Sequence, residues 1–161
     1  MLQSVQLYDQ TGVIVQETEA AMGKDIKVAG VATVSESLKT AFATEDQFGN
    51  PTVNMATAKP VSLLCASGFA QTYNLLTGHR DATLAENGDA GELNTTLWPI
   101  TDLETLEIIS QWDTPEGGKW IVDYDIVDSM LAVNNPDLTN ADIQAIVDSV
   151  TYESTLERLG E

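Results

Sequence analysis

The chain has 161 residues, 43% of them hydrophobic, which fits a folded domain with a real core and excludes global disorder. Twenty-five acidic residues against seven basic ones give a formal net charge of -18 at pH 7. The basic residues are dispersed, so direct binding of nucleic acid or of an anionic membrane surface is not expected. The acidic surplus has three possible roles. It confers solubility, it keeps the protein hydrated in concentrated salt, or it provides a surface that binds a basic partner.

The N-terminal segment predicts a β-hairpin over residues 4–16. Val5 and Leu7 alternate with polar residues, turn-forming residues follow at 9–12, and three β-branched residues at 13–15 resume the strand pattern. The segment has no basic region followed by an apolar run, and no apolar stretch of the chain approaches the roughly 18 residues of a membrane span. We therefore expect synthesis in the cytoplasm without a signal peptide, and no membrane partner.

The next segments predict a strand, a short helix and a polar connection. Hydrophobic β-formers between Met22 and Val34 indicate a strand. Ser35 can cap a short helix over residues 35–44, whose apolar residues form one stripe. Residues 45–58 contain Gly, Asn and Pro and predict a polar connection.

The stretch from Pro60 to Gly78 predicts the central helix of the fold. Its apolar residues recur at helical spacing, and its two end residues suit the first turn and the C-terminal end of a helix. Leu63 and Leu75 place apolar groups on the remaining face as well, so we expect protein on all sides of this helix. The residues that mark its buried face are Val61, Leu64, Cys65, Gly68, Phe69, Thr72 and Leu76.

Residues 79–96 are the longest turn-rich segment and predict a mobile loop. The carboxylates in this loop do not follow the alternating acidic ligands of an EF-hand. We favour a solvated acidic loop over a calcium site, because a hard-cation site needs six or more oxygens placed together.

A second hairpin is predicted over residues 104–127. Residues 104–112 fit either a helix or a strand, whereas hydrophobic and polar residues alternate through 119–127 in the pattern of a half-buried strand. A loop that contains Pro and Gly joins the two segments and would place Trp112 near Trp120 across the hairpin.

The C-terminal region predicts a helix that docks on the core. Thr139 is the expected N-cap, and Asp142 lies near the positive end of the helix dipole. Residues 151–161 either extend this helix or protrude as a tail that binds a neighbouring subunit. The buried side is formed by Ile143, Ile146, Val147 and Val150.

The sequence contains no convincing catalytic constellation and no cofactor motif. Cys65 is expected in the core of a very acidic protein, where a reactive thiolate is not favoured. Asp123 and Asp125 would share one face of the predicted strand, with Asp128 just beyond, and an Asp-x-Asp pair can hold Mg²⁺ or Mn²⁺. We interpret them as the solvent-facing side of a strand and keep a metal site as the weaker alternative.

These elements predict an α+β fold. Antiparallel hairpins would pack on the central buried helix and the C-terminal helix, in a single domain of residues 1–161 with mobile parts at 79–96 and 151–161.

The function that we expect is that of a non-enzymatic structural subunit, which binds itself or other structural subunits through exposed hairpin edges and long loops. A component of a viral, phage-like capsid or tail is an example, and the virion would then be its final location. One alternative is an acidic decoy that inhibits a basic, nucleic-acid-handling protein. Another is a divalent-metal enzyme that uses Asp123 and Asp125.

Overall fold

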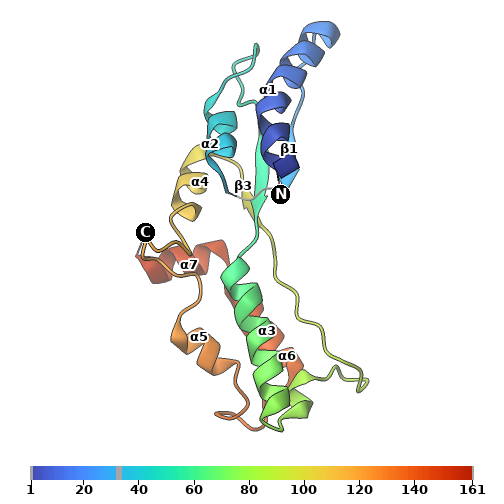
Figure 1. Ribbon diagram of the computed structural model, residues 1–161, viewed down its shortest axis with the longest axis vertical. Helices are drawn as coiled ribbons and strands as arrows, with labels where there is room; N and C mark the ends of the chain where they lie inside the picture. The colour runs from blue at the N-terminus through green and yellow to red at the C-terminus, as the bar shows by residue number, and fades with distance from the viewer. Residues whose placement is uncertain (1, 32–33, 161) are drawn as a thin grey trace. The chain divides into compact units, whose positions relative to one another are not determined.

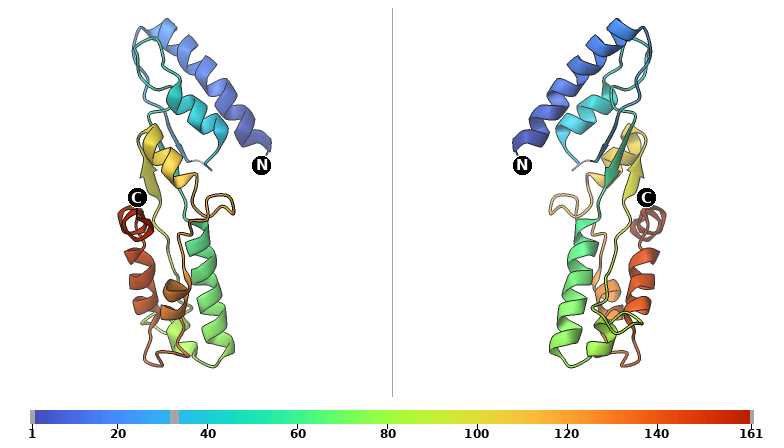
Figure 2. Two further views of the ribbon diagram at one scale, coloured as in Figure 1. Left: turned by 90° about the vertical axis from the view of Figure 1, so that its left-hand side faces the viewer. Right: turned by 90° about the vertical axis from the view of Figure 1, so that its right-hand side faces the viewer.

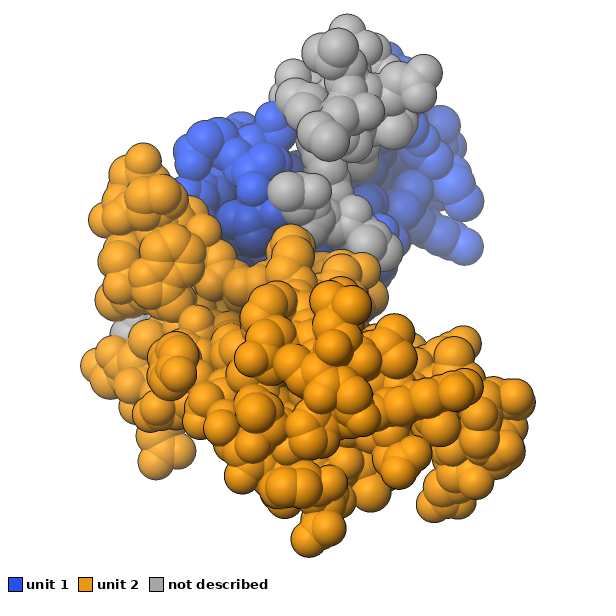
Figure 3. Space-filling model, turned by 60° about the horizontal axis from the view of Figure 1, so that its bottom comes forward, with its two compact units in different colours: residues 1–58, 99–111 blue, residues 59–98, 112–161 orange. Residues whose placement is uncertain are grey.

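The computed structural model describes the backbone of residues 2–31 and 34–160, and the side chains of residues 12–30 and 34–160. About 48% of the chain is helical and 10% is in strands, which form a small three-stranded mixed sheet (Figure 1, Figure 2). The predicted α+β class is therefore confirmed. The chain forms two compact units, residues 1–58 with 99–111 (unit 1) and residues 59–98 with 112–161 (unit 2) (Figure 3).

Unit 1 contains helices packed beside a sheet. Its helices are α1 (Leu2–Met22), α2 (Glu36–Ala43) and α4 (Leu103–Ile109). The strands are β1 (Ala29–Val31), β2 (Met55–Ala58) and β3 (Trp98–Ile100), and β2 ends the segment predicted as a polar connection. The sheet order is β1-β2-β3, with β1 and β2 parallel and Gly30 opposite Ala56. Helix α2 contacts both α1 and α4.

The short helices of unit 1 begin at residues whose side chains cap them. Ser35 precedes α2 as predicted, and its hydroxyl accepts the Leu38 N–H at 3.2 Å. Asp102 precedes α4 and accepts the Thr105 N–H at 2.7 Å. The capped helices then bury their apolar stripes, which include Leu38, Ala41, Phe42, Leu106 and Ile109.

The hairpin predicted over residues 4–16 is wrong, because this backbone belongs to α1. Val15 and Glu19, four residues apart, are both buried, which is the spacing of one helix face. Gly12 does not interrupt the helix, although glycine costs about 1 kcal/mol there and its neighbours Val13 and Ile14 are β-branched, so packing of the buried face stabilises the helix. The side chains that suggested strand alternation, at positions 5 and 7, lie outside the described side chains.

Unit 2 is built from helices. They are α3 (Val61–Leu76), the short 3₁₀ helix η1 (Arg80–Thr83), α5 (Tyr124–Ser129), α6 (Asn140–Ser149) and α7 (Tyr152–Leu159). Helix α3, predicted from its end signals, is thereby confirmed, and it contacts η1, α5 and α6. In the side views α3 and α6 form opposite sides of this unit (Figure 2). Among the helices described, none is long and apolar enough to traverse a lipid bilayer.

The second predicted hairpin, over residues 104–127, is also wrong, because α4 and α5 occupy its two strands. Asp123 is the N-cap of α5 and accepts the Ile126 N–H at 2.9 Å. The carbonyls of Trp120 and Ile121 accept hydrogen bonds from Arg158 and pair with no strand. The loop itself does close as expected, since the Asp113 N–H donates to the Lys119 carbonyl at 2.8 Å.

The C-terminal helices confirm the predicted Thr139 cap and show that residues 152–159 form a separate helix. Thr139 and Asp142 make a reciprocal capping box, whereas α7 begins at its own cap, Thr151. Tyr152 packs on Trp112 and Trp98, with ring centroids 5.5 and 6.4 Å away respectively. Trp112 thus joins an aromatic cluster of unit 2 with Trp98 and Tyr152.

Asn74 ties α3 to the segment that follows α5. Its side chain is fully buried, its amide donates to the Met130 carbonyl at 2.9 Å, and its carbonyl oxygen accepts the Ala132 N–H at 2.8 Å. One side chain therefore satisfies two backbone groups that water cannot reach.

Replacing Asn74 with Ala leaves these two buried backbone groups without partners. We expect Asn74→Ala to lower the free energy of unfolding by about 2–5 kcal/mol, because each unsatisfied group costs about 1–3 kcal/mol. Urea denaturation followed by circular dichroism measures this loss. The exposed Asn135→Ala should stay within about 0.5 kcal/mol of the parent. Equal urea midpoints for the two variants would contradict this role.

The caps of α4 and α6 predict two carboxyl groups with low pKa values. Hydrogen bonds from Thr105 to Asp102 and from Thr139 to Asp142 lower each pKa below 3.8, and burial opposes them. A lowered folded-state pKa adds stability that is present above the unfolded pKa and is lost as pH falls through the folded value. NMR titration should give both midpoints below 3.8. Thr139→Ala should return the Asp142 midpoint towards 3.8 and leave that of Asp102 unchanged.

Candidate functional site

Helix α3 exposes a continuous apolar face to solvent. The exposed fraction of the side chain is 51% for Phe69 and reaches 80% for Leu76. The exposed positions recur at spacings of three and four residues, so they lie along one side of the helix. We call this surface the α3 face. It is formed by Val61, Leu64, Cys65, Gly68, Phe69, Thr72, Leu75 and Leu76.

The predicted burial of α3 is therefore wrong, because the residues predicted to lie in the core form the exposed face. The buried face consists of Leu63, Ser67, Ala70 and Asn74. Two of its four members are polar, and the Ser67 hydroxyl donates to the Leu64 carbonyl at 3.0 Å. Hydrogen bonds of Asn74 require that this face turn inward, which leaves the more apolar face outside.

The α3 face carries no charge, in a chain whose net charge is -18. Between Lys59 and Arg80 the sequence contains no Asp, Glu, Lys or Arg, and the only titratable groups there are Cys65, Tyr73 and His79. Cys65 is exposed, so its predicted place in the core is also wrong. A second copy of this chain could approach here without bringing like charges into contact.

Gly68 lies at the middle of the α3 face and has no evident role within the chain. A Cβ built at this position would meet nothing within 4 Å, and its φ angle is not in the left-handed region. Glycine inside a helix costs about 0.5–1 kcal/mol relative to alanine. Close approach of another backbone to the helix is one physical use of that missing side chain.

A second surface feature of unit 2 is an acidic groove of about 860 Å³ between the 81–94 segment and α6. Gln144 joins its two sides, because its amide donates to the Asn94 carbonyl at 2.9 Å and its carbonyl oxygen accepts the Asn94 N–H at 2.8 Å. Among the described residues, no basic side chain lines the groove. The charged residues along it are Asp81, Glu86, Glu92 and Asp148.

The three aspartates suggested by the sequence as weak metal ligands each have a structural partner or position. Asp123 caps α5, and its second oxygen pairs with Arg158 at 3.0 Å. Asp128 accepts the side-chain amide of Asn134 at 2.8 Å, and Asp125 lies in the first turn of α5. Helix α5 replaces the strand that would have aligned Asp123 with Asp125. A metal role for these residues stays a prediction.

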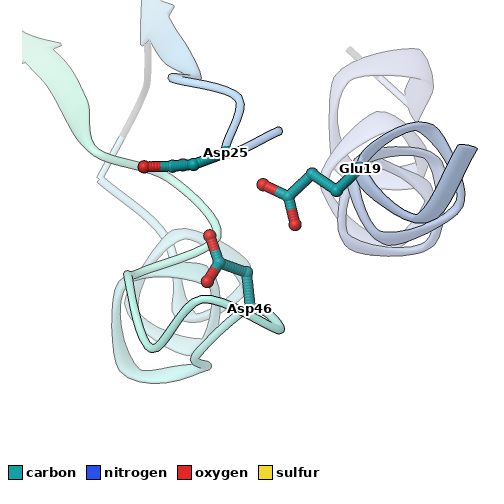
Figure 4. A group of neighbouring side chains, drawn as sticks. All are labelled: Glu19, Asp25 and Asp46. Carbon is teal, nitrogen blue, oxygen red and sulfur yellow. The ribbon is translucent and has the colours of Figure 1, made fainter. Parts of the chain in front are cut away.

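Unit 1 brings three other carboxylates together that sequence reasoning missed. Glu19 on α1, Asp25 after that helix and Asp46 after α2 place one oxygen each within 4.8 Å of one another (Figure 4). Glu19 is completely buried, Asp46 is 8% exposed, and Asp25 lies at the surface. No spacing in the sequence predicts that these three carboxylates lie together, because their proximity depends on how α1 packs against α2.

The Asp46 carboxylate is held by its own turn. The Asn50 N–H, which donates to Oδ1 at 2.9 Å, contributes most to lowering the pKa of Asp46. The Phe48 N–H and the charge of Lys27 also lower the pKa of Asp46, and burial opposes them. A lowered pKa keeps Asp46 ionised at neutral pH.

No family model matches this chain, and neither a curated protein nor a solved structure is significantly similar to it.

Proposed function

We propose that this protein is a non-enzymatic structural subunit that self-associates by packing the α3 face of one copy against the α3 face of another. Subunits of a viral capsid or tail also act through contacts between copies. We therefore propose that this protein is a component of a virion. The supporting observation is the exposed, uncharged apolar α3 face, which would allow two copies of a very acidic chain to meet without repulsion between like charges.

The chemistry of the α3 face favours a second copy of the chain as its occupant. The face offers apolar side chains on both sides of Gly68, and two such helices can interlock ridges with grooves. Elsewhere two copies would repel each other because of their shared negative charge. Screening by salt should therefore strengthen self-association, whereas it would weaken the binding of a basic partner.

The size of the α3 face indicates that one such contact is weak. A 16-residue helix is roughly 24 Å long and roughly 10 Å wide. Its face covers a few hundred Å² on each copy, which is less than the roughly 800 Å² per partner of a stable dimer. A weak contact of this kind suits an assembly in which each subunit has several neighbours.

Polar substitutions on the α3 face should prevent self-association. We expect Leu64→Gln and Phe69→Gln each to weaken it by about tenfold or more, since truncating a central interface residue costs about 2 kcal/mol. Glutamine is a good helix former, so α3 itself should remain folded. Light scattering and sedimentation over a concentration series, at low salt and at about 1 M salt, measure the mass.

Two further variants separate this contact from general hydrophobicity. Val133→Gln removes an exposed apolar residue of unit 2 outside α3 and should leave association unchanged. Gly68→Ala should stabilise the isolated chain by about 0.5–1 kcal/mol while weakening association. A parent protein that stays monomeric at every concentration and at both salts would refute self-association through this face.

The acidic groove supports a second candidate function, the binding of a basic partner as a decoy or inhibitor. Four carboxylates line one groove, and none of the described residues along it is basic, which favours a cationic segment. This partner class is distinct from a second copy of the chain, and its binding should decrease as salt rises.

Decalysine provides a simple probe of the acidic groove. We expect the double variant Glu86→Gln/Glu92→Gln to bind it about three- to tenfold more weakly at low salt, since an exposed ion pair contributes about 0.2–1 kcal/mol. Isothermal titration calorimetry gives the affinities. Glu104→Gln/Glu107→Gln changes the net charge equally in unit 1 and is the matched control. Equal losses for the two double variants would show attraction to net charge alone.

A further inference from the structure

The carboxylate of Glu19 is buried in unit 1 with one oxygen that has no hydrogen-bond partner. Its Oε1 accepts the Ile26 N–H at 3.0 Å, whereas Oε2 is inaccessible to solvent and unpartnered. Glu19 reaches from α1 towards Asp25 and Asp46 (Figure 4). An unpaired buried carboxylate oxygen is costly, and a cation or a hydrogen-bond donor beside it would remove that cost.

We propose that Glu19, Asp25 and Asp46 bind a divalent cation, with Ca²⁺ as the best fit. All three ligands are carboxylates, whose oxygens hard cations prefer, and bidentate binding together with water molecules would complete the six to eight oxygens around Ca²⁺. Two oxygens bound to the same Ca²⁺ at about 2.3–2.6 Å are at most about 5 Å apart. The oxygens of this group lie within 4.8 Å of one another and so satisfy that limit.

The net charge of the carboxylate group also favours a divalent ion. Lys27 pairs with Asp25 at 2.6 Å, and three carboxylates with one ammonium leave a charge of about -2, which one divalent cation neutralises. The Lys27 side chain is 61% exposed, so its ammonium lies at the surface end of the group. It therefore does not replace the ion at the buried end, where the unpartnered Glu19 oxygen lies.

The ligands come from three segments that are separate in the sequence. Glu19 lies one turn before the C-terminal end of α1, Asp25 follows that helix, and Asp46 belongs to the turn after α2. The Asn50 side-chain amide already links Asp25 to that turn at 3.1 Å. A bound cation would therefore hold α1 against the α2 turn and stabilise unit 1.

The competing occupant is a proton shared between Glu19 and Asp46. The Glu19→Gln variant distinguishes the two, because its amide can retain the bond to the Ile26 N–H and donate to Asp46 as the proton would. This substitution removes a cation ligand but preserves the neutral hydrogen-bonded arrangement. Glu17→Gln changes an exposed carboxylate two residues away and is the matched control.

The test is calorimetric titration of the chelator-treated full chain with CaCl₂ at neutral pH, together with thermal unfolding. MgCl₂ and NaCl at equal ionic strength control for screening. We expect one Ca²⁺ per chain and a rise of several degrees in Tm at saturation, in the parent and in Glu17→Gln. In Glu19→Gln the Ca²⁺ affinity should fall by about tenfold or more, with the helical circular dichroism spectrum retained.

Three outcomes would overturn the proposal. The first is that the parent shows neither heat nor a Tm shift at about 10 mM CaCl₂, well above the range of known Ca²⁺ sites. The second is that Glu19→Gln binds Ca²⁺ as tightly as the parent, which would indicate general attraction to an acidic chain. The third is that Glu19→Gln and the parent without Ca²⁺ are equally stable and CaCl₂ shifts neither, which identifies the shared proton.

Discussion

The orientation of α3 depends on one buried amide. The side chain of Asn74 bonds to the backbone of Met130 and of Ala132, and both of these residues are fully buried. If the other face of α3 turned inward, two buried backbone groups would lose their partners, at a cost of about 1–3 kcal/mol each. The folded chain keeps these two hydrogen bonds and leaves the more apolar face of α3 exposed.

The distribution of charge gives the two units different properties. Unit 2 combines an uncharged, exposed helix face with an acidic groove. Unit 1 instead buries carboxylates that the overall acidity would keep in water. Burial of Glu19 is therefore a different phenomenon from the general surplus of acidic residues, which is solvated.

Local signals in the sequence predicted those elements that local hydrogen bonds determine. Ser35 and Thr139 mark helix starts that the structure confirms, because capping depends only on residues three positions apart. The two hairpin predictions are wrong because alternation of hydrophobic and polar residues over a short segment does not exclude a helix. In the second hairpin, Asp123 is the N-cap of α5 and not a strand residue. The α3 face and the carboxylate group depend on partners far away in the chain, such as those of Asn74, so no local pattern could reveal them.

The distance in sequence between α3 and its anchors has a consequence during synthesis. The backbone groups that bond to Asn74 lie 56 and 58 residues further along the chain. At about 5–20 residues per second, a ribosome needs roughly 3–12 seconds to make them after Asn74. Throughout that interval the Asn74 side chain lacks both of the backbone groups that hold it in the folded chain. The emerging chain therefore presents the apolar residues of α3 before unit 2 can complete its fold.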